Sequence, residues 1–270
     1  MTPKVSIGVP VFNGAHRILD SLTNLSCQTF GDFEVIVSDN ASTDGSAELV
    51  EAFCRRDPRF RLIRQPENVG PMENFRSVVQ AAKTDLFLWR ADDDLSSLNY
   101  VELLHGAMRS SPNALLAVAR RIQLRVGRAK KRVGTEQLPV GDPAQYSATD
   151  LLRWSTTSWF YGMMRTEYAR TSINAVIADY GALWAWDHLM VLPAIAKRRV
   201  TAAYDAVFFH RLQQRPETAS ALQEKEPRAV LGDRYLDFCR SCVSDSDLSA
   251  DQRVSFSKAV ERHASRILAA

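Results

Sequence analysis

The segment FEVIVSDNASTDGS, residues 33–46, decides the fold of this chain. Its first half is almost continuously apolar, which is typical of a parallel strand that is covered on both faces. Its second half is a cluster of turn and helix-capping residues, and a helical pattern with Leu49, Val50 and Phe53 follows it. A buried strand that runs directly into a helix is the unit from which parallel α/β sheets are built.

The same unit repeats on both sides of that segment. Strand-like runs are VSIGVPV (5–11), FRLIR (60–64) and DLFLW (85–89), and helical patterns fall at residues 18–25 and 71–82. Pro10 is a poor residue inside a central strand, so we expect the first strand to end near it and Asn13 to cap the next helix. The alternation of strands and helices predicts a parallel sheet with covering helices, an α/β fold.

Three polar clusters directly follow strands of this predicted sheet. They are Phe12-Asn13, Asp39-Asn40 and Asp92-Asp93-Asp94. In parallel α/β sheets, ligands bind beyond the carboxyl ends of the strands. Each cluster taken alone is also compatible with ordinary loop chemistry. Because all three fall at the same edge, the sequence favours a binding site there.

The three consecutive aspartates, Asp92 to Asp94, raise a question of charge. Like charges at that spacing repel, and each carboxylate loses hydration if it is even partly buried. A divalent cation such as Mg²⁺ or Mn²⁺, bound together with a diphosphate, would balance them, because hard cations prefer carboxylate oxygens. A solvated acidic turn at the start of a helix is the alternative.

The second half of the chain is less regular. Strand-like runs are ALLAVARRIQL (114–124), SWFYGMMR (158–165) and VTAAYDAVFFHR (200–211), and helical patterns fall at 184–196 and from about 226 onward. Seven residues between Arg120 and Arg132 are basic, and no acidic residue occurs from Leu103 to Thr135. A solvated hairpin explains this run, and so does a patch for anionic lipid or for a phosphate-bearing acceptor.

Composition limits the class of protein. The 270 residues are 46% apolar and 24% charged, and the formal net charge of +3 is too small to indicate a nucleic-acid partner. No apolar stretch approaches the roughly 18–20 residues of a membrane helix, and the N-terminus does not resemble a signal peptide. We therefore expect a cytoplasmic protein, with peripheral contact to the inner face of the membrane through Arg120–Arg132. Cys239 and Cys242 form a C-x-x-C that we interpret as core, with a redox pair as the alternative.

These segments resemble family 2 of the glycosyltransferases, which have the GT-A fold. The resemblance rests on VSIGVPVFNG, FEVIVSDNASTDGS, RQPENVGPMENFRSVVQAA and WRADDDL, and it extends to WAWDHL and DAVFFHR. It covers roughly residues 4–215. It implies a Rossmann-like, mostly parallel central sheet with helices on both faces, followed by a C-terminal helical segment.

Position by position, the resemblance implies a nucleotide-sugar site. It assigns the nucleotide pocket to Pro10, Val11, Phe12 and Asn13, the flanks of the donor site to Asn68 and Asn74, a ribose or metal contact to Asp92, and metal ligation to Asp93, Asp94 and His210. Asp39 resembles the carboxylate that reads the base, usually a uracil, through its ring N–H, because a carboxylate only accepts hydrogen bonds. Arg90 stands where the family often has another aspartate, so the choice of the two metal-binding carboxylates stays open. For His210 the alternative is an ordinary strand-end histidine.

Asp187 in WAWDHL occupies the place of the family's catalytic base. The implied reaction moves a sugar from a nucleotide diphosphate, UDP favoured, to an acceptor hydroxyl with inversion at the anomeric carbon. Asp187 would take the hydroxyl proton, and Mn²⁺ or Mg²⁺ would neutralise the leaving diphosphate. A helix cap is the structural alternative for Asp187. Trp159, Trp184 and Trp186 are candidates to stack on sugar faces, with core packing as the alternative.

The resemblance also implies an organisation of the chain. Residues 1–225 would be the glycosyltransferase domain, with 1–98 binding the nucleotide sugar and 99–225 the acceptor, and residues 226–270 would be a C-terminal helical extension. The acceptor would be a glycan or a lipid-linked glycan, and bacterial surface polysaccharide assembly is the setting that the resemblance suggests. The sugar, the linkage and the oligomeric state stay open.

Two other classes of protein remain as alternatives. A sugar-phosphate nucleotidyltransferase would share the sheet and the metal, but it should carry a glycine-rich, basic loop after the first strand, which PVFNGAHR lacks. A non-catalytic module that binds nucleotide sugars would keep Asp39 and lose the acids, whereas this chain keeps Asp93 and Asp187. Transfer or hydrolysis of a sugar nucleotide separates an enzyme from a binding module.

Overall fold

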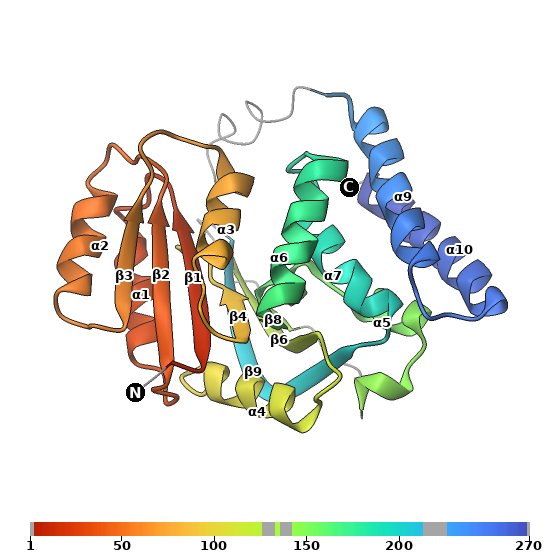
Figure 1. Ribbon diagram of the computed structural model, residues 1–270, viewed down its shortest axis with the longest axis horizontal. Coiled ribbons are helices and arrows are strands. Elements are labelled where there is room, and N and C mark those ends of the chain that lie inside the picture. The colour runs from red at the N-terminus through yellow and green to blue at the C-terminus, as the bar shows by residue number, and fades with distance from the viewer. Residues whose placement is uncertain (1–2, 126–132, 136–141, 213–225, 269–270) are drawn as a thin grey trace.

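The protein, described by a computed structural model at residues 3–125, 133–135, 142–212 and 226–268, is built around one mixed sheet (Figure 1). The strands are β1 (Val5–Val11), β2 (Phe33–Asp39), β3 (Phe60–Arg64), β4 (Leu86–Trp89), β5 (Leu95–Ser96), β6 (Leu116–Arg125), β7 (Val133–Thr135), β8 (Met163–Arg165) and β9 (Val200–Leu212). The α-helices are α1 (Ile18–Ser26), α2 (Ser46–Cys54), α3 (Pro71–Gln80), α4 (Tyr100–Ser110), α5 (Ala148–Trp154), α6 (Thr166–Ala175), α7 (Trp186–Ala196), α9 (Arg228–Ser244) and α10 (Ala250–Leu268).

The first four long strands form a parallel half-sheet in the order β3-β2-β1-β4. β1 is buried along its whole length, and β2 along all but one residue, which is why their sequences lack polar alternation. Helix α3 packs closely on β1, because a Cβ placed on Gly8 would lie 2.5 Å from a methyl carbon of Val78. The predicted parallel α/β architecture is confirmed. Pro10 lies inside β1, which ends one residue later.

The second half extends the sheet with mixed strand directions. β8 is antiparallel to both β4 and β6, β6 is parallel to β9, and β9 ends antiparallel to the short β5. The strand expected over 158–165 is wrong in its first half, where Thr157–Tyr161 forms a 3₁₀-helix. That turn buries Trp159 and Phe160 in the core, and the strand begins only at Met163.

Helices α9 and α10 close the C-terminal end of the molecule beside α5 and α7 (Figure 1). Tyr235, Phe238 and Phe256 belong to the same hydrophobic cluster as the side chains of α5 and α7, so this pair shares the core of the second half. The helical pattern expected from about 226 is confirmed. Cys239 is buried, Cys242 is half-buried, and both thiols are free; burial raises the pKa of Cys242 to about 12, in agreement with a core role.

Candidate active site

The carboxyl ends of β1, β2 and β4 meet at one edge of the sheet, which we call the carboxyl edge (residues 12–14, 39–42, 68–74 and 90–94). Val11 pairs with Asp39 across β1 and β2, and the backbone N–H of Asn40 donates to the carbonyl of Val11 at 2.9 Å. A Cβ placed on Gly14 would lie 2.5 Å from Oδ2 of Asp92, so the loop after β1 touches the aspartates after β4. The three polar clusters therefore do come together.

Asp39 presents an unused acceptor at this edge. The residue is 3% exposed, and its Oδ2 accepts a hydrogen bond from the backbone N–H of Ser42 at 3.0 Å. Its Oδ1 is also buried but has no hydrogen-bond partner among the described residues. A buried carboxylate oxygen without a partner is costly, so this atom is poised to accept a hydrogen bond from a ligand.

Asn74 and Asn68 occupy different positions at the carboxyl edge. The amide nitrogen of Asn74 donates to the carbonyls of Val11 (3.3 Å) and Ser38 (3.1 Å), which ties α3 to the ends of β1 and β2. Its buried Oδ1 has no partner in the described part of the chain, so it is a second open acceptor. Asn68 instead accepts hydrogen bonds from the Asn40 side chain and from the backbone of Gly70, both at 2.9 Å, and so holds the loop before α3.

The stretch Pro10 to Asn13 contributes to the site in two ways. Pro10 and Val11 are buried in β1, whereas the ring of Phe12 is 44% exposed directly beyond it. Asn13 adopts a left-handed backbone (φ 49°), and its Oδ1 accepts from the backbone N–H of Thr43 at 3.0 Å. The expectation that Asn13 caps the following helix is wrong, because α1 begins only at Ile18 and the asparagine side chain is already bound across the edge.

The positive charges that balance the aspartates include arginines of this chain. Arg17 contacts Oδ2 of Asp92 through both Nη2 (2.8 Å) and Nε (2.9 Å). Arg211 donates from its backbone N–H to Oδ1 of Asp94 at 2.8 Å and from its Nε to the carbonyl of Asp93. Sequence reasoning considered only a metal ion here, although Arg17 follows the asparagine-glycine loop closely and Arg211 adjoins the candidate His210.

Arg90, the departure from the family pattern, lies fully buried beneath the aspartates. Its guanidinium donates to Oγ of Ser96 at 2.7 Å and lies over the rings of Tyr100 (5.5 Å) and Phe208 (5.7 Å). Asp94 is 1% exposed, and its burial and the neighbouring Asp93 raise its pKa to about 7, against the pull of Arg90 and Arg211. Asp94 and Arg90 are thus both buried, and the charge of each acts on the pKa of the other.

His210 is brought to the aspartates by strand pairing. Leu95 of β5 lies opposite Phe209 of β9 in an antiparallel ladder, so His210 follows on β9 where Asp94 precedes β5. The imidazole ring lies 6.4 Å from the ring of Phe208, centroid to centroid. The placement of His210 beside the aspartates agrees with the sequence prediction, and its role stays a prediction.

Asp93 is the aspartate that best fits a divalent cation. Within the described ranges no cluster of three or more His, Cys, Asp or Glu side chains forms a complete metal site. A cation that arrives with a diphosphate needs only one or two protein carboxylates, because phosphate oxygens and water complete its shell. Asp92 is engaged by Arg17 and Asp94 is buried, whereas the hydrogen bond that Asp93 makes within the described part of the chain uses its backbone carbonyl, with Arg211 as donor.

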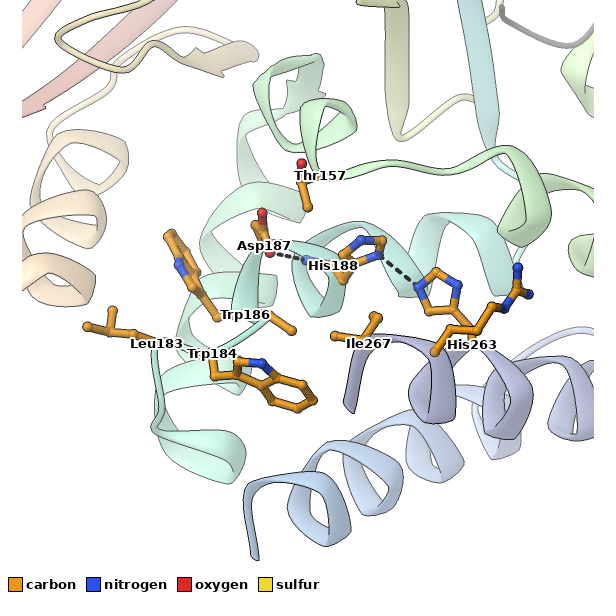
Figure 2. Close-up of a pocket in the computed structure, with 10 residues that line it drawn as sticks. Thr157, Leu183, Trp184, Trp186, Asp187, His188, His263 and Ile267 are labelled. Atoms are coloured by element: carbon orange, nitrogen blue, oxygen red, sulfur yellow. Dashed lines mark hydrogen bonds between the residues drawn. The ribbon is translucent and has the colours of Figure 1, made fainter. Parts of the chain in front are cut away.

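Asp187 lies at a pocket of about 520 Å³, shown in Figure 2 and called here the Asp187 pocket. Its walls are Thr157 of the 3₁₀-helix, residues 183–188 at the start of α7, and His263, Arg266 and Ile267 of α10. Oδ1 of Asp187 accepts from the backbone N–H of His188 at 3.0 Å, and burial raises the pKa of Asp187 to about 6. Ala185 occupies the N-cap position of α7, in a left-handed conformation (φ 55°). Asp187 is therefore the second residue of the helix and not its cap.

Stacked and edge-on aromatic rings join this pocket to the carboxyl edge. Trp186 lies 5.1 Å from Phe75, which follows Asn74 on α3, and 4.9 Å from Phe160. Phe160 in turn stacks on Trp89, the residue before Arg90, at 4.8 Å. Trp159 is only 2% exposed and belongs to the core, so it does not offer a face to a sugar, whereas Trp184 and Trp186 line the pocket.

The basic run Arg120–Arg132 lies only partly within the described structure. Arg120 and Arg121 are half-buried on β6, and an Nη1 of Arg121 donates to the hydroxyl of Thr157 at 3.4 Å, at the wall of the Asp187 pocket. Residues 126–132 lie outside the described residues, and the expected membrane contact through them stays a prediction. Of the described helices, none combines the length and the apolar character needed to cross a bilayer.

Solved structures with the same fold belong to glycosyltransferases. The crystal structure of S. aureus TarS 1-349 in complex with UDP-GlcNAc superposes with a TM-score of 0.72 at 18% identity, over 98% of this chain and 70% of that one. Mannosyltransferase PcManGT from Pyrobaculum calidifontis, in complex with GDP-Man and Mn²⁺, gives a TM-score of 0.60 at 17% identity, over 100% of this chain and 75% of that one. The curled α/β sheet is therefore a GT-A-like fold, as expected.

Curated relatives match a smaller part of the chain. Glycosyltransferase GlyG of Streptococcus pneumoniae is 28% identical over 105 residues, which are 39% of this chain and 35% of that protein. The GalNAc(5)-diNAcBac-PP-undecaprenol beta-1,3-glucosyltransferase of Campylobacter jejuni is 31% identical over 107 residues, 39% of this chain and 32% of that protein. The chain thus spans about a third of the length of these relatives. The sequence model of Glycosyl transferase family 2 matches residues 6–172, more than half of the chain. With the motifs, the sheet order and this match in agreement, the chain belongs to glycosyltransferase family 2.

Proposed function

We propose that this protein transfers a sugar from a nucleoside diphosphate, UDP favoured, to an acceptor hydroxyl. The observation that carries the proposal is the buried Oδ1 of Asp39, which lacks a partner among the described residues at the edge where such sheets bind ligands. Uracil offers a ring N–H that a carboxylate oxygen can accept. The complexes of TarS with UDP-GlcNAc and of PcManGT with GDP-Man support a nucleotide-sugar donor for this family member as well.

The donor diphosphate would lie next to the aspartates. Asp93 would hold Mn²⁺ or Mg²⁺, with Asp92 as the ribose or second metal contact and His210 beside them, while buried Asp94 balances Arg90. A bound divalent cation supplies the charge that neutralises a leaving diphosphate. Arg17 and Arg211, fixed at the same edge by the aspartates, add permanent positive charge close to that leaving group.

Asp187 would act as the general base. Its pKa, raised to about 6 by burial, leaves the carboxylate ionised at neutral pH but more basic than an ordinary aspartate. The acceptor hydroxyl gives its proton to Asp187 as its oxygen attacks the anomeric carbon, and the bond to the diphosphate breaks on the opposite side. Attack opposite to the leaving group inverts the configuration at that carbon.

The division of labour along the chain follows from this assignment. Residues 1–98 would bind the donor, residues 99–225 the acceptor, and residues 226–270 would be the C-terminal helical extension. A glycan or lipid-linked glycan acceptor, in bacterial surface polysaccharide assembly at the inner face of the membrane, agrees with the undecaprenol-linked substrate named for the Campylobacter jejuni relative.

A nucleotide-sugar panel tests the proposed function. With Mn²⁺ present, we expect UDP to be released from a UDP-sugar, slowly by hydrolysis and faster when an acceptor is supplied. UDP at about 100 times its dissociation constant should add roughly 2.7 kcal/mol to the free energy of unfolding. Equal stabilisation by UDP in EDTA contradicts the metal-bridged site. Binding without release indicates a non-catalytic module, and release of pyrophosphate from UTP and a sugar phosphate indicates a nucleotidyltransferase.

A further inference from the structure

Helix α10 forms one wall of the pocket that contains the candidate base. His263 and Ile267 face the start of α7 across the Asp187 pocket (Figure 2), and Arg266 lines the same pocket. All of α10 lies outside residues 6–172, the part that the family model matches. This wall is therefore built by the C-terminal segment beyond the part that the family model matches.

A second pocket, of about 280 Å³, continues from the first between α5 and α10. The two pockets share His263 and Arg266, and the second adds Arg153 of α5 and Arg262 of α10. We call this second pocket the arginine groove. Three guanidinium groups line it, and no ion pair to a described residue engages any of them. Asp150 also lines the groove, and its carboxylate accepts a hydrogen bond from the Ser147 hydroxyl at 2.6 Å.

Besides Arg266, a pair of neutral histidines lies where the two pockets meet. Nδ1 of His188 and Nε2 of His263 lie 3.3 Å apart in a hydrogen bond that joins α7 to α10 (Figure 2). Burial lowers the pKa of both imidazoles to about 4, so at neutral pH both rings are neutral. The positive charge of this region is therefore carried by the three arginines, of which Arg266 also lines the Asp187 pocket.

We infer that the arginine groove binds a phosphate carried by the acceptor, while the hydroxyl to be glycosylated reaches Asp187. This inference rests on the proposed function and adds the chemical class of the acceptor, a saccharide joined to a phosphate or diphosphate. Several guanidinium groups in one groove match phosphate oxygens in charge and in hydrogen-bond geometry. The same chemistry occurs in a free sugar phosphate and in a lipid-linked diphosphate, and the two sources can be separated by experiment.

Binding of glucose 1-phosphate to the UDP-saturated protein tests the groove. The variant Arg262→Gln/Arg266→Gln should weaken glucose 1-phosphate binding at least about tenfold, because it removes two charge-assisted contacts. The matched control, Arg240→Gln/Lys258→Gln, removes the same charge from exposed positions of α9 and α10 outside the groove and should bind as the parent does. Methyl glucoside, which lacks the phosphate, should not distinguish the variants.

A second arm asks whether all three arginines hold one phosphate. If they do, Arg153→Gln from the opposite wall and Arg266→Gln should be non-additive in a double-mutant cycle. Phosphatidylcholine vesicles that carry a polyprenyl diphosphate report on the lipid-linked source, with phosphatidylglycerol vesicles as the control for a merely anionic surface. Binding of either phosphate probe that depends on the groove arginines supports the inference and identifies the source.

The inference is overturned if both phosphate probes bind the Arg262→Gln/Arg266→Gln variant as they bind the parent, or if the control variant loses as much. It is also overturned if neither probe binds the parent. UDP affinity is measured on the same samples and should be equal in all variants. If the parent does not bind UDP, the proposed donor site is contradicted. If the parent binds UDP but neither phosphate probe, only the acceptor assignment is contradicted.

Discussion

The carboxyl edge and the Asp187 pocket are both built around aspartates, yet the chain assembles them in opposite ways. The carboxyl edge collects residues that directly follow regular parallel strands, so hydrogen-bonded register alone aligns them. The Asp187 pocket joins a 3₁₀-helix, the start of α7 and the far end of α10, which only tertiary packing brings together. An edge made by register can be found from sequence, and a pocket made by packing cannot.

The two sites also differ in charge. At the carboxyl edge, carboxylates outnumber open cations, because Arg17 is paired with Asp92 and Arg90 is buried next to Asp94. Near Asp187 the excess is positive, since the arginine groove lacks ion pairs to described residues. The first site is thus suited to a ligand that brings a cation with it, and the second to a ligand that brings an anion.

The substitution Asp187→Asn should have the largest effect, because it removes the only function that the second site is proposed to supply to the chemical step. We expect the transfer rate to fall on the order of 10²–10⁴-fold, while UDP affinity with Mn²⁺ stays as in the parent. Asparagine keeps an oxygen that can accept the His188 backbone N–H, so α7 should form normally. Rate measurements at saturating donor check this.

The thermal stability of the Asp187→Asn variant gives a second, independent measurement on the same residue. The folded-state pKa of Asp187 lies above the ordinary value, so ionisation of this group destabilises the fold as the pH rises through about 6. Asp187→Asn should therefore melt at a higher temperature than the parent at pH 8, and this difference should vanish below about pH 4. Transfer that survives within a few-fold would leave the base to be sought elsewhere in the second half.

Asp93→Ala should have the next largest effect, on the first site alone. Mn²⁺ affinity in the presence of UDP should fall by at least about 10–100-fold, the loss typical when groups that support metal ligands are removed. The empty protein should be as stable as the parent or slightly more stable, because one member of a crowd of like charges is gone. Calorimetric titration with Mn²⁺ measures the first quantity and thermal unfolding the second. A marked loss of stability without ligand would mean a structural role.

Asp39→Asn should change which base is preferred. With one amide atom held by the backbone of Ser42, the other would present N–H groups towards the base, where uracil also presents N–H. UDP affinity should fall roughly 10–100-fold, the scale of a hydrogen bond to a charged group, whereas CDP, with an acceptor at the same ring position, should lose less. Asp93→Ala should leave the ratio of UDP to CDP affinity unchanged. An unchanged ratio in Asp39→Asn would remove Asp39 from base recognition.

The pH dependence of the transfer rate should show the smallest effect, a fall of about tenfold for each pH unit below the pKa of Asp187. The base must be ionised, so transfer at saturating substrates should be flat above about pH 6 and should fall below it. Asp94, with its pKa near 7, titrates in the same range but belongs to the other site, so UDP affinity must be followed separately. A transfer profile that is flat down to pH 5 would contradict Asp187 as the base.

The elements of the first half and their parallel arrangement could be predicted, because the local hydrophobic pattern identifies the strands and helices and their alternation indicates a parallel sheet. Asp39 lies at the end of a predicted strand, Asp93 follows another, and Asn74 lies on a predicted helix, while their roles stay predictions. Arg17 and Arg211 were missed, since their pairing depends on a helix start and on the distant β9. The 3₁₀-helix at Thr157–Tyr161 was read as a strand, because its buried aromatic residues have the same apolar pattern in both conformations.

The residues of the Asp187 pocket are harder to predict from the sequence than those of the carboxyl edge. Asp187 itself was found through the resemblance, but His263 and Arg266 lie in a helix with no motif, seventy-odd residues further along the chain. Nothing in the periodicity of α10 says which of its faces meets α7 and α5, because its apolar face packs into the core and its polar face is rich in charges throughout. Only the packed structure selects the arginines that border the pocket.

The position of α10 has a consequence for how the protein is made. A ribosome releases the chain from its N-terminus, and domains acquire structure as they emerge. The carboxyl edge can form once β9 has been synthesised and has paired with β5. The Asp187 pocket can form only after Ile267 has been synthesised, because this residue is part of its wall. Under the proposed assignment, a chain that lacks only the end of α10 would keep the aspartates of the proposed donor site and lose Ile267 from the wall of the proposed acceptor pocket. We expect such a fragment to release UDP from the donor without transfer to an acceptor, so the end of α10 would couple use of the donor to formation of product.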